Sequence, residues 1–385
     1  MHPTPQLPEK DETLHLQQQI VRLQALLEAA RQVHATVHEE EVLTQVLRIV
    51  VRELEMSGAA FLSAGLVHGQ ISDGERPNSA YPLLDRDGQL LAELLIEPPG
   101  GRSLTLYEAD FIEGLALQAA VALENARNHQ RNLEYARLQQ DLDAARQIQR
   151  SLLPQRLPEL PGYSLAFRSD ACYEVGGDYL DLVAQPDGAL LMAVADVAGK
   201  GLASAIMSTG FRSAFRAVAA SAPPLDQLAA RMNRHHWREG EEARLRYVTA
   251  LFVRLHPDEG WIEAVNAGHN PGFLLQPGME PQLIHASGTP LGLIYEATYV
   301  SERFRFPPGS RLLLYTDGLT EVFCGDEEFS AERLMDCFSR SPELCSDAIL
   351  DALWTAVAEF SAGSPPGDDR TALALCRTSP VETMP

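Results

Sequence analysis

The stretch LLMAVADVAGKGLASAIMS (190–208) decides the fold of the C-terminal half of this chain. Its first part, Leu190 to Ala195, is a short apolar run that ends in an aspartate and a glycine-rich turn, which is typical of a buried strand. The part that follows, Leu202 to Val218, carries apolar residues at helical spacing and predicts a helix that packs on a sheet. A strand, an acidic turn and a helix therefore follow one another here.

Three further turns outside this stretch have the same texture, a short apolar strand that ends in glycine and aspartate. The four turns are Glu174–Asp178, Asp196–Gly201, Tyr315–Glu321 and Gly367–Thr371. A single Asp-Gly pair is no evidence of function, because most are ordinary turns. Four aspartates at strand ends can meet at one edge of a sheet, where their repulsion favours divalent cations. Since soft ligands are missing from these turns, Mg²⁺ or Mn²⁺ is the expected ion.

With these turns in this order, residues 146 to 376 resemble the metal-dependent PPM-type protein phosphatases. The resemblance is to the bacterial branch named after the sporulation protein SpoIIE and the stress-response regulator RsbU. The matching phrases are SLLPQRLPELPGY, VGGDYLDL, VADVAGKGLASAIMS, VTALFVRL, NAGHNPGFLL, GTPLGL, LLLYTDGLTE and DDRTALAL. Their joint spacing is specific. The resemblance implies a sandwich of two antiparallel sheets flanked by helices, with two Mn²⁺ or Mg²⁺ ions at one edge.

The same resemblance implies roles for individual residues. Asp196 is expected to bridge the two ions, and the carbonyl of Val197 to hold the second. Asp317 and Asp368 are expected to complete the first. Asp178 lies in the family's first acidic motif and is expected to hold metal-bound water or to contact the second ion. Asp196 and Asp178 are thus the predicted catalytic residues.

The roles of other polar residues near these motifs are predicted less specifically. Asp181, Glu174 and Asp369 fit supporting roles or none, and Asp368 is favoured over Asp369 as the direct ligand. Lys200 lacks the spacing of a nucleotide-binding phosphate loop and is placed in a loop-to-helix turn.

Two histidine positions are candidates for a functional role. His269 either assists proton transfer to the leaving oxygen or is hydrogen-bonded to the backbone, and the second interpretation is favoured. His235 and His236 are adjacent on a predicted helix end, where their side chains point in different directions, so they do not form a metal site.

The predicted activity is hydrolysis of phosphoserine or phosphothreonine in a partner protein by water that bridges two cations. In the resembling branch, substrates are commonly anti-anti-sigma proteins with a STAS domain. Two alternatives to this activity remain. In the first, the chain is a scaffold that binds phosphoprotein without chemistry. In the second, it is chiefly a ligand sensor with weak catalysis.

The N-terminal part predicts a helix over residues 1–30 and a small α/β domain over 31–125. The helix carries one apolar stripe, formed by Leu16, Ile20, Leu23 and Leu27. The domain reads as a helix from Glu39 to Met56 and strands at 59–62 and 89–96, with turns at 72–74 and 85–88. With the segment LTLYEADFIEGLALQAAVALENAR, this order resembles a GAF domain. That resemblance implies a ligand pocket or a dimerising face, and a spacer without a pocket has comparable weight.

Residues 108–153 contain no proline and one glycine, and they predict a long helical linker. A coiled-coil seam is indicated by Leu138, Leu142, Ala145, Gln149 and Leu152. The linker therefore pairs two chains into a homodimer, or it lies as a single helix on a neighbouring domain. Prolines at 154, 158 and 161 then mark the boundary of a phosphatase domain over 155–378.

The overall prediction is an α+β chain: a GAF-like sensor, a helical linker and a PPM-type sandwich. The formal charge of -22 disfavours nucleic acid as a partner. No apolar run reaches the length of a membrane helix and no secretory signal is seen, so a cytoplasmic location is expected. Five scattered cysteines fit reduced thiols.

Overall fold

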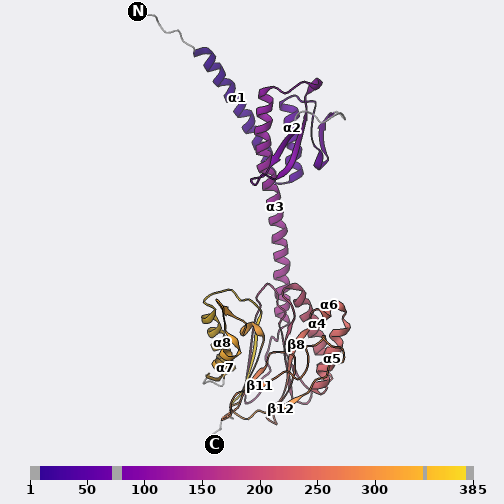
Figure 1. Ribbon diagram of the computed structural model, residues 1–385, viewed down its shortest axis with the longest axis vertical. Helices are drawn as coiled ribbons and strands as arrows, with labels where there is room; N and C mark the ends of the chain where they lie inside the picture. Colours follow the sequence, from indigo (N-terminus) through magenta and orange to yellow (C-terminus); the bar gives the residue numbers. More distant parts are fainter. Residues whose placement is uncertain (1–8, 72–79, 341–344, 379–385) are drawn as a thin grey trace, which may run out of the picture. The chain divides into compact units, whose positions relative to one another are not determined.

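The computed structural model describes residues 9–71, 80–340 and 345–378 (Figure 1). The chain divides into two compact units, Met1–Gln139 and Gln140–Pro385. Among the described residues, no helix is both long enough and apolar enough to cross a bilayer.

The N-terminal unit combines helices with one antiparallel sheet of strand order β2-β1-β4-β3. Its elements are α1 (Glu9–Val33), α2 (Glu39–Glu53), β1 (Gly58–Phe61), η1 (Leu62–Ala64), β2 (Leu66–Gly69), β3 (Ala80–Leu84), β4 (Leu90–Glu97), η2 (Pro99–Gly101) and the first part of α3 (Leu106–Leu152). One core joins them, in which the end of α1, one face of α2 and the buried face of α3 pack against side chains such as Phe61 and Leu94. The predicted helix and strands of this unit are confirmed within two or three residues.

Of two further predictions about this unit, the structure bears on one. The turn at 72–74 lies outside the described residues. The apolar stripe on α1 stays exposed, because Leu16, Ile20, Leu23 and Leu27 keep 54 to 65% of their surface accessible. Nothing in the described part of this unit covers that stripe.

The linker forms one helix, α3, which spans both units. Its N-terminal part contributes buried residues up to Ala126 to the core of the first unit. Its last turns belong to the second unit, where Leu142, Ala145, Gln149 and Leu152 are half-buried. The C-terminal half of the predicted seam therefore packs within its own unit, as the single-helix alternative expects, whereas Leu138 is exposed.

The C-terminal unit contains two five-stranded sheets, ordered β11-β10-β13-β16-β5 and β12-β9-β8-β7-β6. The strands of the first are β5 (Tyr163–Asp170), β10 (Gly272–Leu275), β11 (Gln282–Ile284), β13 (Arg311–Tyr315) and β16 (Arg370–Arg377). Those of the second are β6 (Tyr179–Ala184), β7 (Leu190–Val197), β8 (Val248–His256), β9 (Trp261–Ala267) and β12 (Glu302–Arg305). Every pairing within the two sheets is antiparallel. A short hairpin of β14 (Phe323–Cys324) and β15 (Glu327–Glu328) follows η3 (Asp317–Leu319).

Three layers of apolar side chains hold this unit together. Residues that alternate along β7 and β8 point in opposite directions, so that Met192 and Val253 face the other sheet while Ala193 and Phe252 face helices. The helices on this side are α4 (Leu202–Ala219), α5 (Leu225–Arg238) and α6 (Glu241–Arg244). The outer face of the other sheet is covered by α7 (Ser330–Arg340) and α8 (Ser346–Ser361). Helices thus flank the two sheets on both sides (Figure 1), which confirms the predicted sandwich.

Candidate metal centre

Asp196 and Asp178 approach each other from two neighbouring strands. Asp196 is the last residue but one of β7, and Asp178 immediately precedes β6, which pairs with β7. Gly177 makes the approach close, since a Cβ on it would lie 3.0 Å from the Val197 carbonyl oxygen and 3.4 Å from Asp196 Oδ1. A side chain at position 177 would require the neighbouring atoms to shift by a few tenths of an ångström.

Asp317 comes from the other sheet, in the turn after β13. The residue before it, Thr316, donates its hydroxyl to Asp178 Oδ2 at 2.8 Å and accepts the Thr371 amide at 3.0 Å. The backbone amide of Thr316 also donates to the Thr371 carbonyl at 2.9 Å. One threonine therefore joins the turn of Asp317, the start of β16 and the carboxylate of Asp178.

The last acidic pair, Asp368 and Asp369, precedes β16, and its two members have different surroundings. Asp369 is 8% exposed and accepts the amides of Cys172 at 2.8 Å and of Gly177 at 2.6 Å. Asp368 is partly exposed and lies 2.8 Å from the ammonium of Lys200. Asp369 therefore anchors the loop that leads to Asp178, while Asp368 keeps its carboxylate at the solvent side.

The electrostatics of these carboxylates reflect their crowding. Burial, together with the charges of Asp317, Asp368 and Asp369, raises the pKa of Asp196 to about 7. Burial and the charges of nearby acidic groups, Asp368 among them, raise the pKa of Asp317 to about 6. The pKa of Asp178 is well above its usual range because of burial first and the Asp196 charge second. Such shifts mean that ionising the whole group costs free energy.

A divalent cation would relieve this cost, because it stabilises ionised carboxylates and takes oxygen ligands. The donor set fits hard cations: it consists of carboxylates and the Val197 carbonyl, without a thiolate or imidazole among the predicted ligands. In the described part of the chain, however, no three acidic, histidine or cysteine side chains lie close enough to form a ready cage. The charges of Asp317, Asp368 and Asp369 act on Asp196, and an ion would have to draw these carboxylates closer together.

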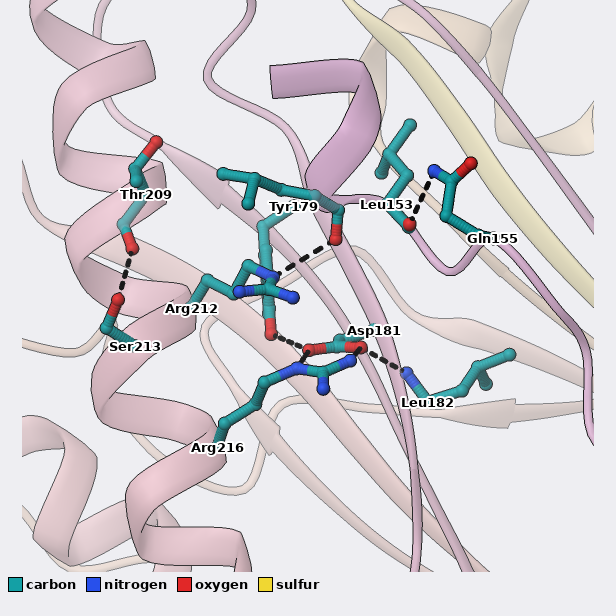
Figure 2. A network of polar contacts seen from close by, with 10 residues as sticks. Leu153, Gln155, Tyr179, Asp181, Leu182, Thr209, Arg212, Ser213 and Arg216 are labelled. Atoms are coloured by element: carbon teal, nitrogen blue, oxygen red, sulfur yellow. Dashed lines mark hydrogen bonds and ion pairs between the residues drawn. The ribbon is translucent and has the colours of Figure 1, made fainter. Parts of the chain in front are cut away.

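Asp181, which the sequence associated with the same motif, lies in a separate network (Figure 2). Arg216 of α4 donates to both of its oxygens at 2.7 Å, and Tyr179 and the Leu182 amide donate at 2.7 and 2.9 Å. Asp181 is fully buried, so all its acceptor capacity serves this pairing of β6 with α4. It has a structural role, which leaves no free carboxylate oxygen for an ion.

Glu174 contributes to the site through its backbone. Its carbonyl accepts Arg146 Nε at 2.7 Å, and the neighbouring Tyr173 carbonyl accepts the same guanidinium at 3.1 Å. Further along, Gln149 accepts the Gly176 amide at 3.1 Å and donates to the Gly176 carbonyl at 2.6 Å. The end of α3 thus holds the loop that leads to Asp178.

The histidines behave as the favoured interpretations expect. His269 is buried and hydrogen-bonded, with Nδ1 2.8 Å from the Thr249 hydroxyl and Nε2 2.9 Å from the Tyr315 carbonyl. Burial lowers its pKa to about 4, so the ring is neutral at physiological pH. His236 contacts the carbonyls of Ala243 and Arg246 through Nε2 and serves the same kind of role at the end of α5.

Some functional contacts were missed by reasoning from the sequence. Thr316 stood inside a quoted motif, but a threonine beside an aspartate carries no signal that it will bond to a different aspartate 138 positions away. The contact of Lys200 with Asp368 was also missed, although its place in the turn before α4 is confirmed.

Comparison with a solved structure places this geometry in a class of domains. The chain is similar to the SiaA PP2C domain of Pseudomonas aeruginosa, with a TM-score of 0.55 and 23% identity, over 64% of this chain and 99% of that one. At this identity the likeness concerns the fold, and the fold of the C-terminal unit is therefore of the PP2C type.

The sequence comparisons then identify the family. The model described as "Stage II sporulation protein E (SpoIIE)" matches residues 186–378, which is half of the chain, so this protein belongs to the SpoIIE family. The predicted resemblance to this branch is confirmed. Asp178 lies just outside the matched range, whereas Asp196, Asp317 and Asp368 lie within it.

Three curated relatives are similar to this chain over about half to two thirds of its length. Protein IcfG of Synechocystis is 25% identical over 62% of this chain and 41% of its own length. Phosphoserine phosphatases RsbP and RsbU of Bacillus subtilis are 27% and 24% identical, over 47% and 66% of this chain and 45% and 69% of their own lengths. The chain thus spans less than half of IcfG and of RsbP.

Proposed function

We propose that this chain is a metal-dependent protein serine/threonine phosphatase that uses two Mn²⁺ or Mg²⁺ ions. The observation that carries the proposal is the meeting of carboxylates from separate turns, with the pKa of Asp178, Asp196 and Asp317 raised by burial and acidic neighbours. The curated relatives RsbP and RsbU, both named phosphoserine phosphatases, support the same class of reaction.

The residues that would hold the ions are Asp196 between them, the Val197 carbonyl and Asp178 for one, and Asp317 and Asp368 for the other. Bound ions of this kind make water a nucleophile near neutral pH and neutralise charge on a phosphoryl group. The chain itself orients these ligands: Thr316 fixes Asp178 through its hydroxyl. Asp369 supports the arrangement from behind, because backbone amides already occupy its oxygens.

The test of this proposal is a pair of matched substitutions. With Mn²⁺ and p-nitrophenyl phosphate, Asp196→Asn is expected to lower kcat/KM by about 10³ or more, since it removes a charge aimed at the reacting centre. Asp187→Asn is the control, because Asp187 is exposed and its Oδ1 accepts the Ala189 amide, an interaction that asparagine retains. Full turnover in Asp196→Asn would remove the assignment of the bridging ligand.

The substrate we propose is a phosphoserine or phosphothreonine in a small STAS-domain protein of the anti-anti-sigma type. The names of RsbP and RsbU, both phosphoserine phosphatases, support phosphoserine as the group that is hydrolysed, and the STAS-domain protein is proposed from the resemblance to this branch. Purified chain and a phosphorylated STAS protein, mixed with Mn²⁺, should release inorganic phosphate faster than the chain releases it from a phosphotyrosine peptide. Equal rates on both would argue against a protein-serine/threonine substrate.

A scaffold without chemistry is the second candidate, and one observation favours it: the described residues do not form a ready cage of three ligands. Calorimetric titration with Mn²⁺ separates the two. A phosphatase shows saturable binding that Asp196→Asn weakens, whereas a scaffold shows none.

We further propose that the N-terminal unit, GAF-like in its order of elements, regulates the site through α3. Support comes from contacts within the C-terminal unit: Arg146 and Gln149 bond to the loop before Asp178, and Arg212 of α4 donates to the Leu152 carbonyl at 3.1 Å. A rotation of α3 would therefore move both the loop and the helix that follows Asp196. We also propose that the chain forms a homodimer with α1 and α3 at its interface. Its proposed location is the cytoplasm.

A further inference from the structure

Lysine is almost absent from this chain. Of the 31 lysines and arginines, Lys10 and Lys200 are the only lysines, and all the others are arginine. Lys200 is therefore the one lysine of the C-terminal unit, and it stands between two glycines, Gly199 and Gly201, that both have positive φ. The position combines a rare residue type with a turn of unusual backbone freedom.

The ammonium of Lys200 reaches the candidate metal centre. Its Nζ lies 2.8 Å from Asp368 Oδ2 and donates to the Gly367 carbonyl at 2.6 Å. Among the ion pairs of the described residues, this is the one that involves a predicted metal ligand. A tethered cation therefore already occupies one of the carboxylates that an ion would use.

An arginine at position 200 would keep the positive charge and change the shape of the donor group. A guanidinium is a planar fork that binds a carboxylate through two parallel bonds, whereas an ammonium is a compact point charge with three rotatable donors. The turn also lies against an arginine, since a Cβ on Gly199 would be 2.4 Å from Arg246 Nη1. Of the two cationic side chains at this turn, Lys200 is the one that forms the ion pair with Asp368.

We propose that Lys200 competes with a metal ion for Asp368 and so sets the metal affinity of the site. The inference rests on the proposed metal centre. Lys200 already contacts Oδ2 of Asp368, and the Asp369 amide donates to Oδ1 at 2.9 Å, so a cation would have to share an oxygen that already has a partner. The two positive charges, a few ångströms apart, would also repel. Removal of the ammonium therefore strengthens metal binding, and its release from Asp368 accompanies metal binding.

The first experiment is calorimetric titration of the full chain with Mn²⁺. Lys200→Met is expected to tighten the dissociation constant by about fivefold to tenfold, an estimate for a partly exposed pair of charges. Lys200→Arg, which keeps the charge, should stay within about twofold of the natural chain. The control is Arg156→Met, which removes the same charge from an exposed position of the same unit and should change nothing.

The outcomes separate this inference from the proposed function. If the natural chain binds no Mn²⁺, the metal centre itself is wrong. If it binds and Lys200→Met binds with the same or weaker affinity, Lys200 is not a competitor. Equal tightening by Arg156→Met would mean that total charge, and not contact with Asp368, sets the affinity.

A second experiment observes Lys200 in the natural chain and uses a substitution only to assign its resonance. Labelling with [ε-¹³C]lysine gives two side-chain resonances, and Lys200→Met identifies the one from Lys200. Saturating Mg²⁺, a diamagnetic ion, should shift the Lys200 resonance and leave that of Lys10 in place. An unmoved Lys200 resonance in a chain that binds Mg²⁺ would overturn the proposal.

Discussion

The role of each acidic side chain in this site depends on the partners that its carboxylate oxygens already have. Asp369 and Asp181 are both buried acids, but backbone amides take the oxygens of the first and Arg216 takes those of the second. Burial and acidic neighbours raise the pKa of Asp369 as well as those of Asp196 and Asp317, which reach about 7 and about 6. A cation bound to Asp196 and Asp317 would offset the free-energy cost of ionising them.

These raised pKa values predict a pH dependence. Because the pKa of Asp196 is about 7 and that of Asp317 about 6 in the folded chain, metal binding at pH 6 should displace about 1.4 protons from these two carboxylates, about 0.9 from Asp196 and about 0.5 from Asp317. At pH 8.5 both carboxylates are already ionised, so the displacement from this pair should fall towards zero. The measurement is titration with Mn²⁺ in buffers of different ionisation enthalpy, after prior removal of metal by a chelator.

The same shifts fix the sign of the stability change in chelator-treated protein. The folded chain holds protons on these carboxylates above the pKa of about 3.9 that an unfolded aspartate has, so its stability should fall as the pH rises from about 4 to about 7. Asp196→Asn should flatten this slope. A proton count that is the same at pH 6 and 8.5 would contradict the raised pKa values.

At the scale of elements, the last turns of α3 help to position the candidate site. Gln149 makes two hydrogen bonds to Gly176, and a Cβ on the next residue, Gly177, would lie 3.0 Å from the Val197 carbonyl oxygen, beside Asp196. The position of Asp178 thus depends on a helix that begins in the other unit.

Gln149→Ala is accordingly expected to weaken Mn²⁺ affinity by about threefold to tenfold and to lower the unfolding free energy by about 1–2 kcal/mol, since two hydrogen bonds are lost. Calorimetric titration and urea unfolding measure the two effects. Gln147→Ala is the matched control, because Gln147 is exposed on the same helix. Deletion of residues 1–105 with unchanged kinetics and unchanged dimerisation would count against regulation through α3.

At the scale of the whole molecule, the exposed apolar stripe on α1 needs a partner surface. Leu16, Ile20, Leu23 and Leu27 repeat every three or four residues, as in paired helices, and each is more than half exposed. A second copy of the chain satisfies the spacing without any additional protein.

The natural chain of 42.3 kDa should therefore sediment as a dimer, and Leu23→Glu should shift it towards the monomer by placing a charge in the apolar contact. Sedimentation velocity measures the change. Gln17→Glu adds the same charge to an exposed position beside the stripe and should leave the dimer intact. A natural chain that sediments as a monomer at micromolar concentration would remove the proposed pairing.

The sandwich was implied by the resemblance to the PPM-type phosphatases, and the sequence patterns by themselves determined the strands at 190–195 and 311–315, the helix from Leu202 and the aspartates at the strand ends. Those features depend on local patterns, apolar runs of four to eight residues and glycine-aspartate turns, which are visible without coordinates. Only the tertiary structure decided which acids remain available: Asp181 pairs with Arg216, Asp369 holds two amides, Thr316 reaches Asp178 and Lys200 reaches Asp368. These contacts join residues far apart in the chain, and the reason that the sequence could not supply them is physical. Hydrogen bonding and repulsion depend on distance in space, which strand pairing between remote segments sets.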